Sequence, residues 1–230
     1  MDRAINVERH LEHIANMLLL NSSLLFYPGL IHGKMGVAIF FFHHARYTGN
    51  ELFKDYAVFL IGEIMNQIYD YHSLDYENGL AGIGAGIDYL AQNDFIELEE
   101  NTFDDFDRRM YLAVMHDSMS DFSLYNGLSG YGKYWLMRLS IPATTEQAKI
   151  CLLNIYERIK EKLPFLADDA KMDTFCLLYD LSRKSGFEFC NTFFEQYRAL
   201  NFQLSDKNLF FPRLSNSNVG NFAQVYLFNG

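Results

Sequence analysis

A short glycine phrase recurs along the chain and constrains its fold more than any other feature. It reads NGLAGIG at 78–84 and NGLSGYG at 126–132, with a looser copy, HGKMG, at 32–36. The first glycines of the copies stand at 33, 79 and 127, which are 46 and 48 residues apart. A fixed period of this length is typical of repeat architectures, and each copy runs into an apolar helical stretch. The sequence therefore predicts a repeated two-helix unit.

Each copy places two glycines three residues apart at an expected helix start. The pairs are Gly33 and Gly36, Gly79 and Gly82, and Gly127 and Gly130. Glycine lacks Cβ, so it allows another backbone to approach closely, and it tolerates a positive φ in the turn before a helix. We expect these glycines to let helix ends pack tightly around a centre. An alternative is ligand binding, because free N–H groups in a first helical turn make a weak anion site.

Two weaker copies extend the repeat. Asp169–Asp173 precedes the apolar stretch Thr174–Leu181, and Asn216–Gly220 precedes Phe222–Phe228. We expect five repeats within one domain of residues 1–230, each with an outer amphipathic helix, a loop, a glycine phrase and a more apolar inner helix. Inner helices that converge on a centre predict an all-α fold, an α/α toroid or partial toroid of about five helical hairpins.

Local signals predict the bounds of several elements. Helices are expected at 2–20, 34–47, 52–71 and 110–119, with the second glycine phrase leading to a helix that ends near Gln92. The acidic residues of 93–105 suit a solvated loop and a helix start. Thr144-Thr145-Glu146-Gln147 is typical of a capping box.

Composition and charge exclude some functions. The formal net charge of −10 disfavours a nucleic-acid partner, suits solubility and permits a basic partner. Three cysteines without a CxxC pair favour a reducing cytoplasm. Charged residues near the N-terminus argue against a signal peptide, and the longest apolar runs are too short to span a membrane. We therefore expect a cytoplasmic protein.

The three glycine phrases resemble the glycine motifs of the lanthionine synthetase C-like family. That resemblance implies an α/α toroid of seven hairpins around a zinc ion, of which this chain covers the N-terminal five. It also implies a peptide cyclase that adds a cysteine thiol to a dehydroamino acid. The implied functional positions carry other residues here: the first zinc cysteine falls at Ser215, a catalytic aspartate at Ser123 and a histidine at Asp169. The remaining zinc ligands belong to a sixth repeat, beyond the five.

These substitutions predict a metal-free protein without cyclase activity and without catalytic residues. Zinc of this kind requires thiolate and imidazole ligands in tetrahedral geometry. The histidines offer no substitute, since His43 and His44 are adjacent and should point to different faces of a helix. We expect no cofactor, although the family implies zinc.

The resemblance then implies a non-catalytic protein that binds a peptide or a partner enzyme in lanthipeptide-like modified-peptide biosynthesis. The expected binding rim at the inner-helix starts consists of His32, Lys34, Asn78, Asn126 and Asn218. One alternative is an active enzyme: a peptide cyclase, or a carbohydrate-active toroid using carboxylates expected near the inner-helix starts, among Asp88, Asp121, Asp169 and Asp173. Another is a structural module that assembles with another chain, including a second copy of itself.

Closure of the ring is a separate prediction. The last expected helix, Val219–Phe228, is rich in aromatic residues that favour burial. In a closed ring it packs against Leu24, Leu25 and Val37, whereas an open arc leaves it exposed or covered by a dimer partner.

Overall fold

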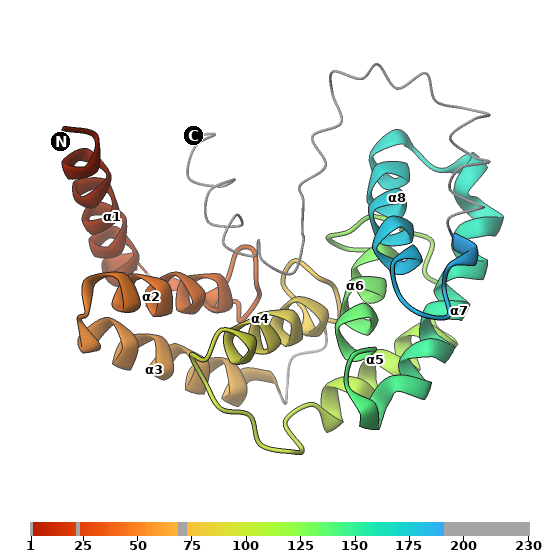
Figure 1. Cartoon of the computed structure of the whole chain (residues 1–230), viewed down its shortest axis with the longest axis horizontal. Coiled ribbons are helices and arrows are strands. Elements are labelled where there is room, and N and C mark those ends of the chain that lie inside the picture. The colour runs from red at the N-terminus through yellow and green to blue at the C-terminus, as the bar shows by residue number, and fades with distance from the viewer. Residues whose placement is uncertain (1, 22–23, 69–72, 191–230) are drawn as a thin grey trace. The chain divides into compact units, whose positions relative to one another are not determined.

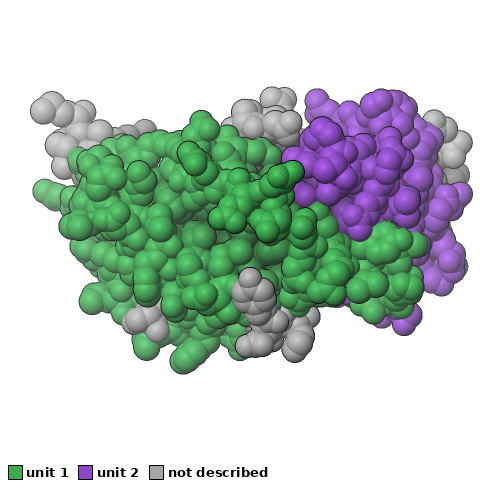
Figure 2. All heavy atoms as spheres, turned by 90° about the horizontal axis from the view of Figure 1, so that it is seen from below, with its two compact units in different colours: residues 1–117 green, residues 118–230 purple. Residues whose placement is uncertain are grey.

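The computed structural model describes residues 2–21, 24–68 and 73–190. Every regular element in these ranges is a helix, which confirms the all-α prediction for this part of the chain. None of these helices combines the length and hydrophobicity needed to cross a membrane. The chain divides into two compact units, residues 1–117 and 118–230, coloured separately in Figure 2. The toroid and the single domain remain predictions.

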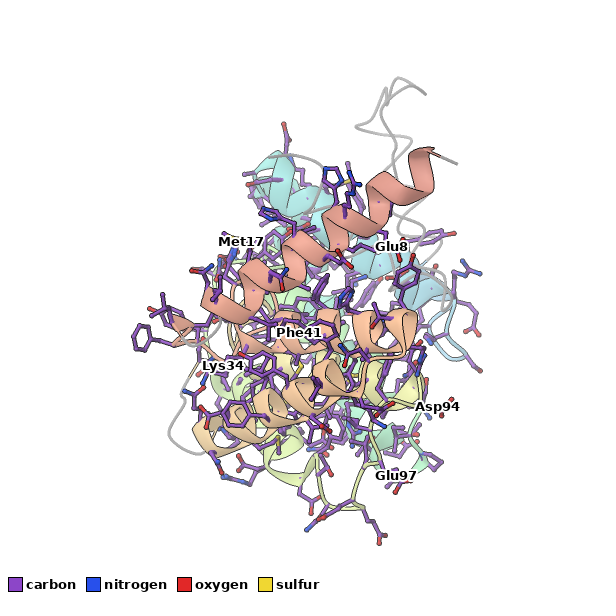
Figure 3. The ribbon with its side chains drawn as sticks, turned by 90° about the vertical axis from the view of Figure 1, so that its left-hand side faces the viewer. Glu8, Met17, Lys34, Phe41, Asp94 and Glu97 are labelled. Atoms are coloured by element: carbon purple, nitrogen blue, oxygen red, sulfur yellow. The ribbon has the colours of Figure 1, made fainter. Side chains whose placement is uncertain are left out.

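Unit 1 contains two helical hairpins and a leading helix. Its elements are α1 (Asp2–Asn21), α2 (Lys34–Thr48), α3 (Glu51–Ile68), α4 (Leu80–Gln92) and α5 (Asp104–His116). Helices α2 and α3 pack as one hairpin and α4 and α5 as the next, and α2 contacts α4 (Figure 1). Helix α1 crosses α2 obliquely (Figures 1 and 3). In this unit the more buried helices α2 and α4 therefore alternate with the more exposed helices α3 and α5.

Aromatic side chains pack between the two helices of the first hairpin, α2 and α3. Phe41 of α2, labelled in Figure 3, is fully buried. Its ring stacks on Phe53 of α3 at 5.7 Å between centroids and meets Tyr56 edge-on at 5.2 Å. Burying a large aromatic side chain contributes roughly 1.5–3 kcal/mol, so this cluster is a main source of cohesion between α2 and α3.

The adjacent histidines of α2 face different neighbours, as predicted. His43 Nε2 lies 2.6 Å from the Tyr89 hydroxyl oxygen of α4. His44 is buried and stacks on Phe40, with the ring of Phe53 of α3 edge-on at 4.6 Å between centroids. One histidine therefore packs on the next inner helix and the other on the outer helix of its own hairpin.

We expect the stability of unit 1 to fall as the pH is lowered from 7 to 5. Burial lowers the pKa of both histidines below 6.5; Arg46 lowers that of His43 further, and Glu12 opposes the shift at His44. Below pH 6.5 the unfolded chain therefore binds protons that the folded unit does not, so the free energy of unfolding decreases. Urea unfolding followed by circular dichroism at several pH values measures this dependence.

A matched pair of variants tests the source of this pH dependence. His44→Phe keeps the ring contacts but removes one titrating group, so it should flatten the decline. His116→Phe, at an exposed position in the same unit, should leave it unchanged. An unaltered decline in His44→Phe would contradict a role for this histidine.

Unit 2 contains the third hairpin and the fourth inner helix. Its helices are α6 (Leu128–Arg138), α7 (Thr145–Lys162) and α8 (Asp168–Ser182), with short 3-10 turns at Pro142–Thr144 and Leu163–Phe165. Helix α6 packs on both α7 and α8. Tyr134 and Trp135 of α6 are completely buried. The predicted fifth repeat, including Val219–Phe228, lies outside the described residues.

Two local predictions are wrong. Helix α5 begins at Asp104, at the expected acidic helix start, but it ends at His116 rather than Met119. Its first turn carries three acidic residues, which a helix N-terminus favours. The capping box at Thr144 does not form. The Thr144 hydroxyl donates to the Arg138 carbonyl, earlier in the chain, at 2.9 Å, and it accepts no hydrogen bond from the first turn of α7. The hydroxyl therefore closes the preceding turn instead of opening α7.

Candidate functional site

The three glycine phrases fold into the same kind of loop before an inner helix. The first helical N–H of each donates to the carbonyl seven residues earlier: Lys34 to Tyr27 at 2.9 Å, Leu80 to Ser73 at 3.1 Å and Leu128 to Asp121 at 3.0 Å. The next N–H does the same in two copies, from Met35 to Pro28 and from Ala81 to Leu74, both at 3.3 Å. In the third copy the Ser129 hydroxyl donates to the Phe122 carbonyl at 2.6 Å.

This loop geometry argues against an anion site at the helix starts. The first N–H of α2, α4 and α6, and the second N–H of α2 and α4, donate to carbonyls of their own loops. The expectation that these groups are free to bind an anion is therefore wrong. Binding at this edge has to use side chains.

The first glycine of each phrase is required by close approach and not by its backbone angles. Gly33, Gly79 and Gly127 have φ values of −136°, −97° and −119°, which other residues can also adopt. A Cβ would lie 2.6 Å from the Gly29 oxygen, 2.7 Å from the Asp75 oxygen and 2.7 Å from the Asp121 oxygen, respectively. At the second glycines Gly36 and Gly82, an added Cβ would overlap the carbonyl oxygens of Leu30 and Tyr76. Gly130, the second glycine of the third phrase, is buried. These glycines therefore allow close approach of the loop that precedes each helix, while packing of the helix ends around a centre stays a prediction.

In unit 1, neighbouring loops are joined directly. The Ile31 N–H donates to the Glu77 carbonyl at 2.9 Å, and His32 Nε2 lies 3.1 Å from the Glu77 carboxylate. Gly29 packs against the backbone of Asn78, whose Oδ1 is buried and has no hydrogen-bond partner among the residues that the structure describes. The structure thus brings His32 and Asn78 of the expected rim to one junction.

Lys34 does not lie on an exposed rim. Its side chain is 8% exposed, and its ammonium lies 3.2 Å from the Glu63 carboxylate of α3. Figure 3 labels Lys34 at the start of α2. Pairing with the outer helix removes it from the surface on which it was predicted. Asn126 is exposed in unit 2, as expected of a rim residue, and Asn218 lies outside the described residues.

A mixed charged cluster lies between α6 and α8 in unit 2. Lys133 of α6 forms an ion pair with Asp180 of α8. Asp173 Oδ2 accepts the Leu124 N–H from the third glycine loop at 2.7 Å. Cys176 is half-buried on α8 between these two carboxylates. The spacing of 173, 176 and 180 places all three on one helix face.

Burial and neighbouring charges set the protonation of this cluster. Burial raises the pKa of Asp173; the Leu124 hydrogen bond and Lys133 oppose this, while Asp169 and Asp121 raise it further. Burial also raises the pKa of the Cys176 thiol, with Lys133 lowering it and Asp180 and Asp173 raising it. Around Asp173 the carboxylates therefore outnumber the single Lys133 ammonium. The Cys176 thiol is protonated at neutral pH.

Cys176 is expected to react slowly and before the other two cysteines. Cys151 and Cys190 are buried, and burial raises the pKa of Cys190 to about 12. Iodoacetamide should label Cys176 first, at a rate that rises with pH because the thiolate is the nucleophile. Lys133→Met should slow labelling and Asp180→Asn should accelerate it, as peptide mapping by mass spectrometry can measure. Faster labelling in Lys133→Met would contradict this electrostatic account.

The carboxylates proposed for enzymatic hydrolysis mostly serve local hydrogen bonds. Asp88 lies in the second half of α4 and accepts from Gln92 at 2.5 Å, so its expected place near a helix start is wrong. Asp121 accepts the Ser123 N–H at 2.7 Å, and Asp169 accepts that of Ala170 at 2.8 Å. In the ranges that the structure covers, no group of three histidine, cysteine, aspartate or glutamate residues is arranged to hold a metal ion.

Interactions between neighbouring repeats recur at close to one repeat length. Examples are His43 with Tyr89, 46 residues apart, and Lys133 with Asp180, 47 apart. Leu124 and Asp173 are 49 apart. Sequence reasoning did not find the Lys133–Asp180 pair, although this periodicity, applied to charged residues, was the signal that could have found it.

Comparisons with known proteins add no relative. A scan against protein-family models gives no match, and a search of curated proteins also gives none. Resemblance to the lanthionine synthetase C-like family therefore remains a prediction based on the glycine phrases.

Proposed function

We propose that this protein is a non-catalytic, lanthionine synthetase C-like α/α toroid. It binds a basic, extended peptide, or the basic segment of a partner enzyme, in lanthipeptide-like modified-peptide biosynthesis. The glycine phrases support the family, and the loop geometry common to α2, α4 and α6 supports a regular array of hairpins. The observation that carries the binding proposal is the excess of carboxylates around Asp173.

A cationic side chain from a peptide would offset the repulsion in this group. Asp121 and Asp169 are exposed and both raise the pKa of Asp173. Lys133, the cation beside them, is already paired with Asp180. A lysine or arginine brought to this edge therefore gains attraction from several carboxylates. The loop carbonyls occupy the leading helix N–H groups, so the contacts come from side chains, including the exposed amide of Asn126.

The test compares two fluorescent twelve-residue peptides of equal length, one rich in lysine and arginine and one rich in glutamate. Fluorescence anisotropy should detect binding of the basic peptide alone, weakened by added salt because exposed charges are screened. The double variant Asp121→Asn, Asp169→Asn should weaken binding by about tenfold or more, since each lost ion pair with a ligand removes roughly a kilocalorie per mole.

The matched control neutralises two exposed carboxylates on α7 of the same unit, Glu146→Gln and Glu157→Gln. Because it changes the net charge equally, it should leave most of the binding intact. Equal weakening by both double variants, or no binding of the basic peptide, would contradict this site.

A further inference from the structure

The third glycine loop is joined to the following repeat by a side chain. The Leu124 N–H of this loop donates to Asp173 Oδ2 of α8 at 2.7 Å. Between the first two glycine loops, in unit 1, the Ile31 N–H donates instead to the backbone carbonyl of Glu77 at 2.9 Å. The fourth repeat lacks the glycine phrase, and a carboxylate is the acceptor there. This contact can therefore change its charge, whereas one to a backbone carbonyl cannot.

The surroundings of Asp173 disfavour its ionised form. Its side chain is half-buried, and two exposed carboxylates act on it: Asp169 lies one turn earlier on α8, and Asp121 lies in the third glycine loop. The Lys133 ammonium of α6 is already paired with another carboxylate of α8. Burial therefore raises the pKa of Asp173, and the opposing effects of the Leu124 hydrogen bond and Lys133 do not cancel this shift.

Opening of this contact would relieve the ionised carboxylate. If Leu124 moves away from α8, Asp173 gains water, and Asp121 on the same loop moves away with it. These gains outweigh the lost hydrogen bond, because burial acts on the pKa of Asp173 more strongly than Leu124 does. The pKa is therefore higher in the closed contact than in the open one. The closed form binds the proton more tightly, so it is favoured as the pH falls toward that pKa.

We propose that the contact between Leu124 and Asp173, which we call the Asp173 junction, is a charge-controlled closure of the third glycine loop on α8. It tightens when a proton or a cation neutralises the carboxylates around it and loosens when all of them are ionised. The same loop carries Asp121 and Asn126, so closure also fixes the side chains that contact a basic peptide. That last consequence rests on the proposed function.

The first experiment follows hydrogen exchange of the Leu124 amide in the full chain by nuclear magnetic resonance. The protection factor, which removes the intrinsic effect of pH on exchange, should rise about threefold or more between pH 7 and pH 5, since one pKa unit corresponds to a factor of ten. Ile31 is the internal control, because its acceptor does not titrate, and its protection should not rise. A Leu124 protection factor that stays constant or falls would overturn the proposal.

A substitution at the acceptor separates charge from hydrogen bonding. Asp173→Asn keeps a side-chain oxygen for the Leu124 N–H but removes the negative charge. It should raise the protection of Leu124 at pH 7 by about threefold or more and remove most of its dependence on pH. An unaltered pH dependence in this variant, with its fold intact, would contradict the role of Asp173.

A second variant leaves the acceptor in place and does not depend on the folding of Asp173→Asn. Neutralising two exposed residues, in the double variant Asp121→Asn, Asp169→Asn, should also raise the protection of Leu124 at pH 7. The matched control Glu146→Gln, Glu157→Gln changes the net charge of the same unit equally and should leave it unchanged. Equal changes in both double variants would overturn a local effect of these carboxylates.

The peptide arm distinguishes this inference from the proposed function. The peptide rich in lysine and arginine should raise the protection of Leu124 at pH 7, and the peptide rich in glutamate should not. Binding of the basic peptide without that rise would overturn the closure and leave the proposed binding site standing. Absence of binding, with the pH dependence and the variants as expected, would contradict the proposed function and support the Asp173 junction.

Discussion

Gly82→Ala is expected to destabilise unit 1 by about 3 kcal/mol, at the upper end of what overpacking a filled site costs. An added Cβ would overlap the Tyr76 carbonyl oxygen, lie 2.9 Å from the Tyr76 carbonyl carbon and 3.0 Å from Leu30 Cβ. The first neighbour is backbone, which cannot turn aside as a flexible side chain does. The substitution therefore pushes the second glycine loop away from α4. Urea unfolding followed by circular dichroism measures the loss.

Gly62→Ala is the matched control for this prediction. A Cβ at Gly62 of α3 would meet no atom within 4 Å. Alanine favours a helix by about 1 kcal/mol over glycine, so this variant should be slightly more stable than the wild type. A similar change in both variants would contradict the requirement for glycine at position 82.

The second large effect is expected where α6 meets α8. A Cβ at Gly132 would lie 2.8 Å from Leu177 Cδ1, with Cδ2 closer still. Leu177 is completely buried, so Gly132→Ala should destabilise unit 2 by about 1–3 kcal/mol through overpacking. Leu177→Ala alone should cost about 2–5 kcal/mol by leaving a cavity.

The double variant should be more stable than the sum of these losses predicts. The new methyl group at position 132 occupies part of the space that Leu177 vacates, so we expect a favourable coupling of about 1 kcal/mol or more. Urea unfolding of the four proteins gives this coupling directly. Gly132→Ala combined with Leu178→Ala is the control, since Leu178 is also completely buried on α8. Equal coupling in both cycles would contradict a specific contact between Gly132 and Leu177.

Much of the fold could be predicted because its main signal is periodic and local. The glycine phrases predicted where α2, α4 and α6 begin, and α4 ends at Gln92 as expected. Loop carbonyls that cap each helix start could not be predicted, since a hydrogen bond spanning seven residues follows no standard capping pattern. Lys34 was misplaced because a charged residue was assumed to be exposed, whereas Glu63 of α3 pairs with it in the folded unit.

The candidate site was less accessible to sequence reasoning than the fold. Asp173 was found as a carboxylate near an inner-helix start, but its bond to Leu124 depends on two segments 49 residues apart. The partnership of Lys133 with Asp180 likewise depends on two helices lying side by side. The composition gives the number of charged side chains, but the packing of the helices determines which of them form ion pairs.

The loop that caps each inner helix also affects how such a chain can change in length. Because the carbonyls that satisfy the first N–H of α2, α4 and α6 come from the residues just before each helix, each of these three repeats brings its own cap. Deleting or duplicating a whole period of 46 to 48 residues therefore leaves the helix starts of the remaining repeats satisfied. A cut within a period separates a helix from its cap. Gene rearrangements that keep the period intact are accordingly the ones this architecture tolerates.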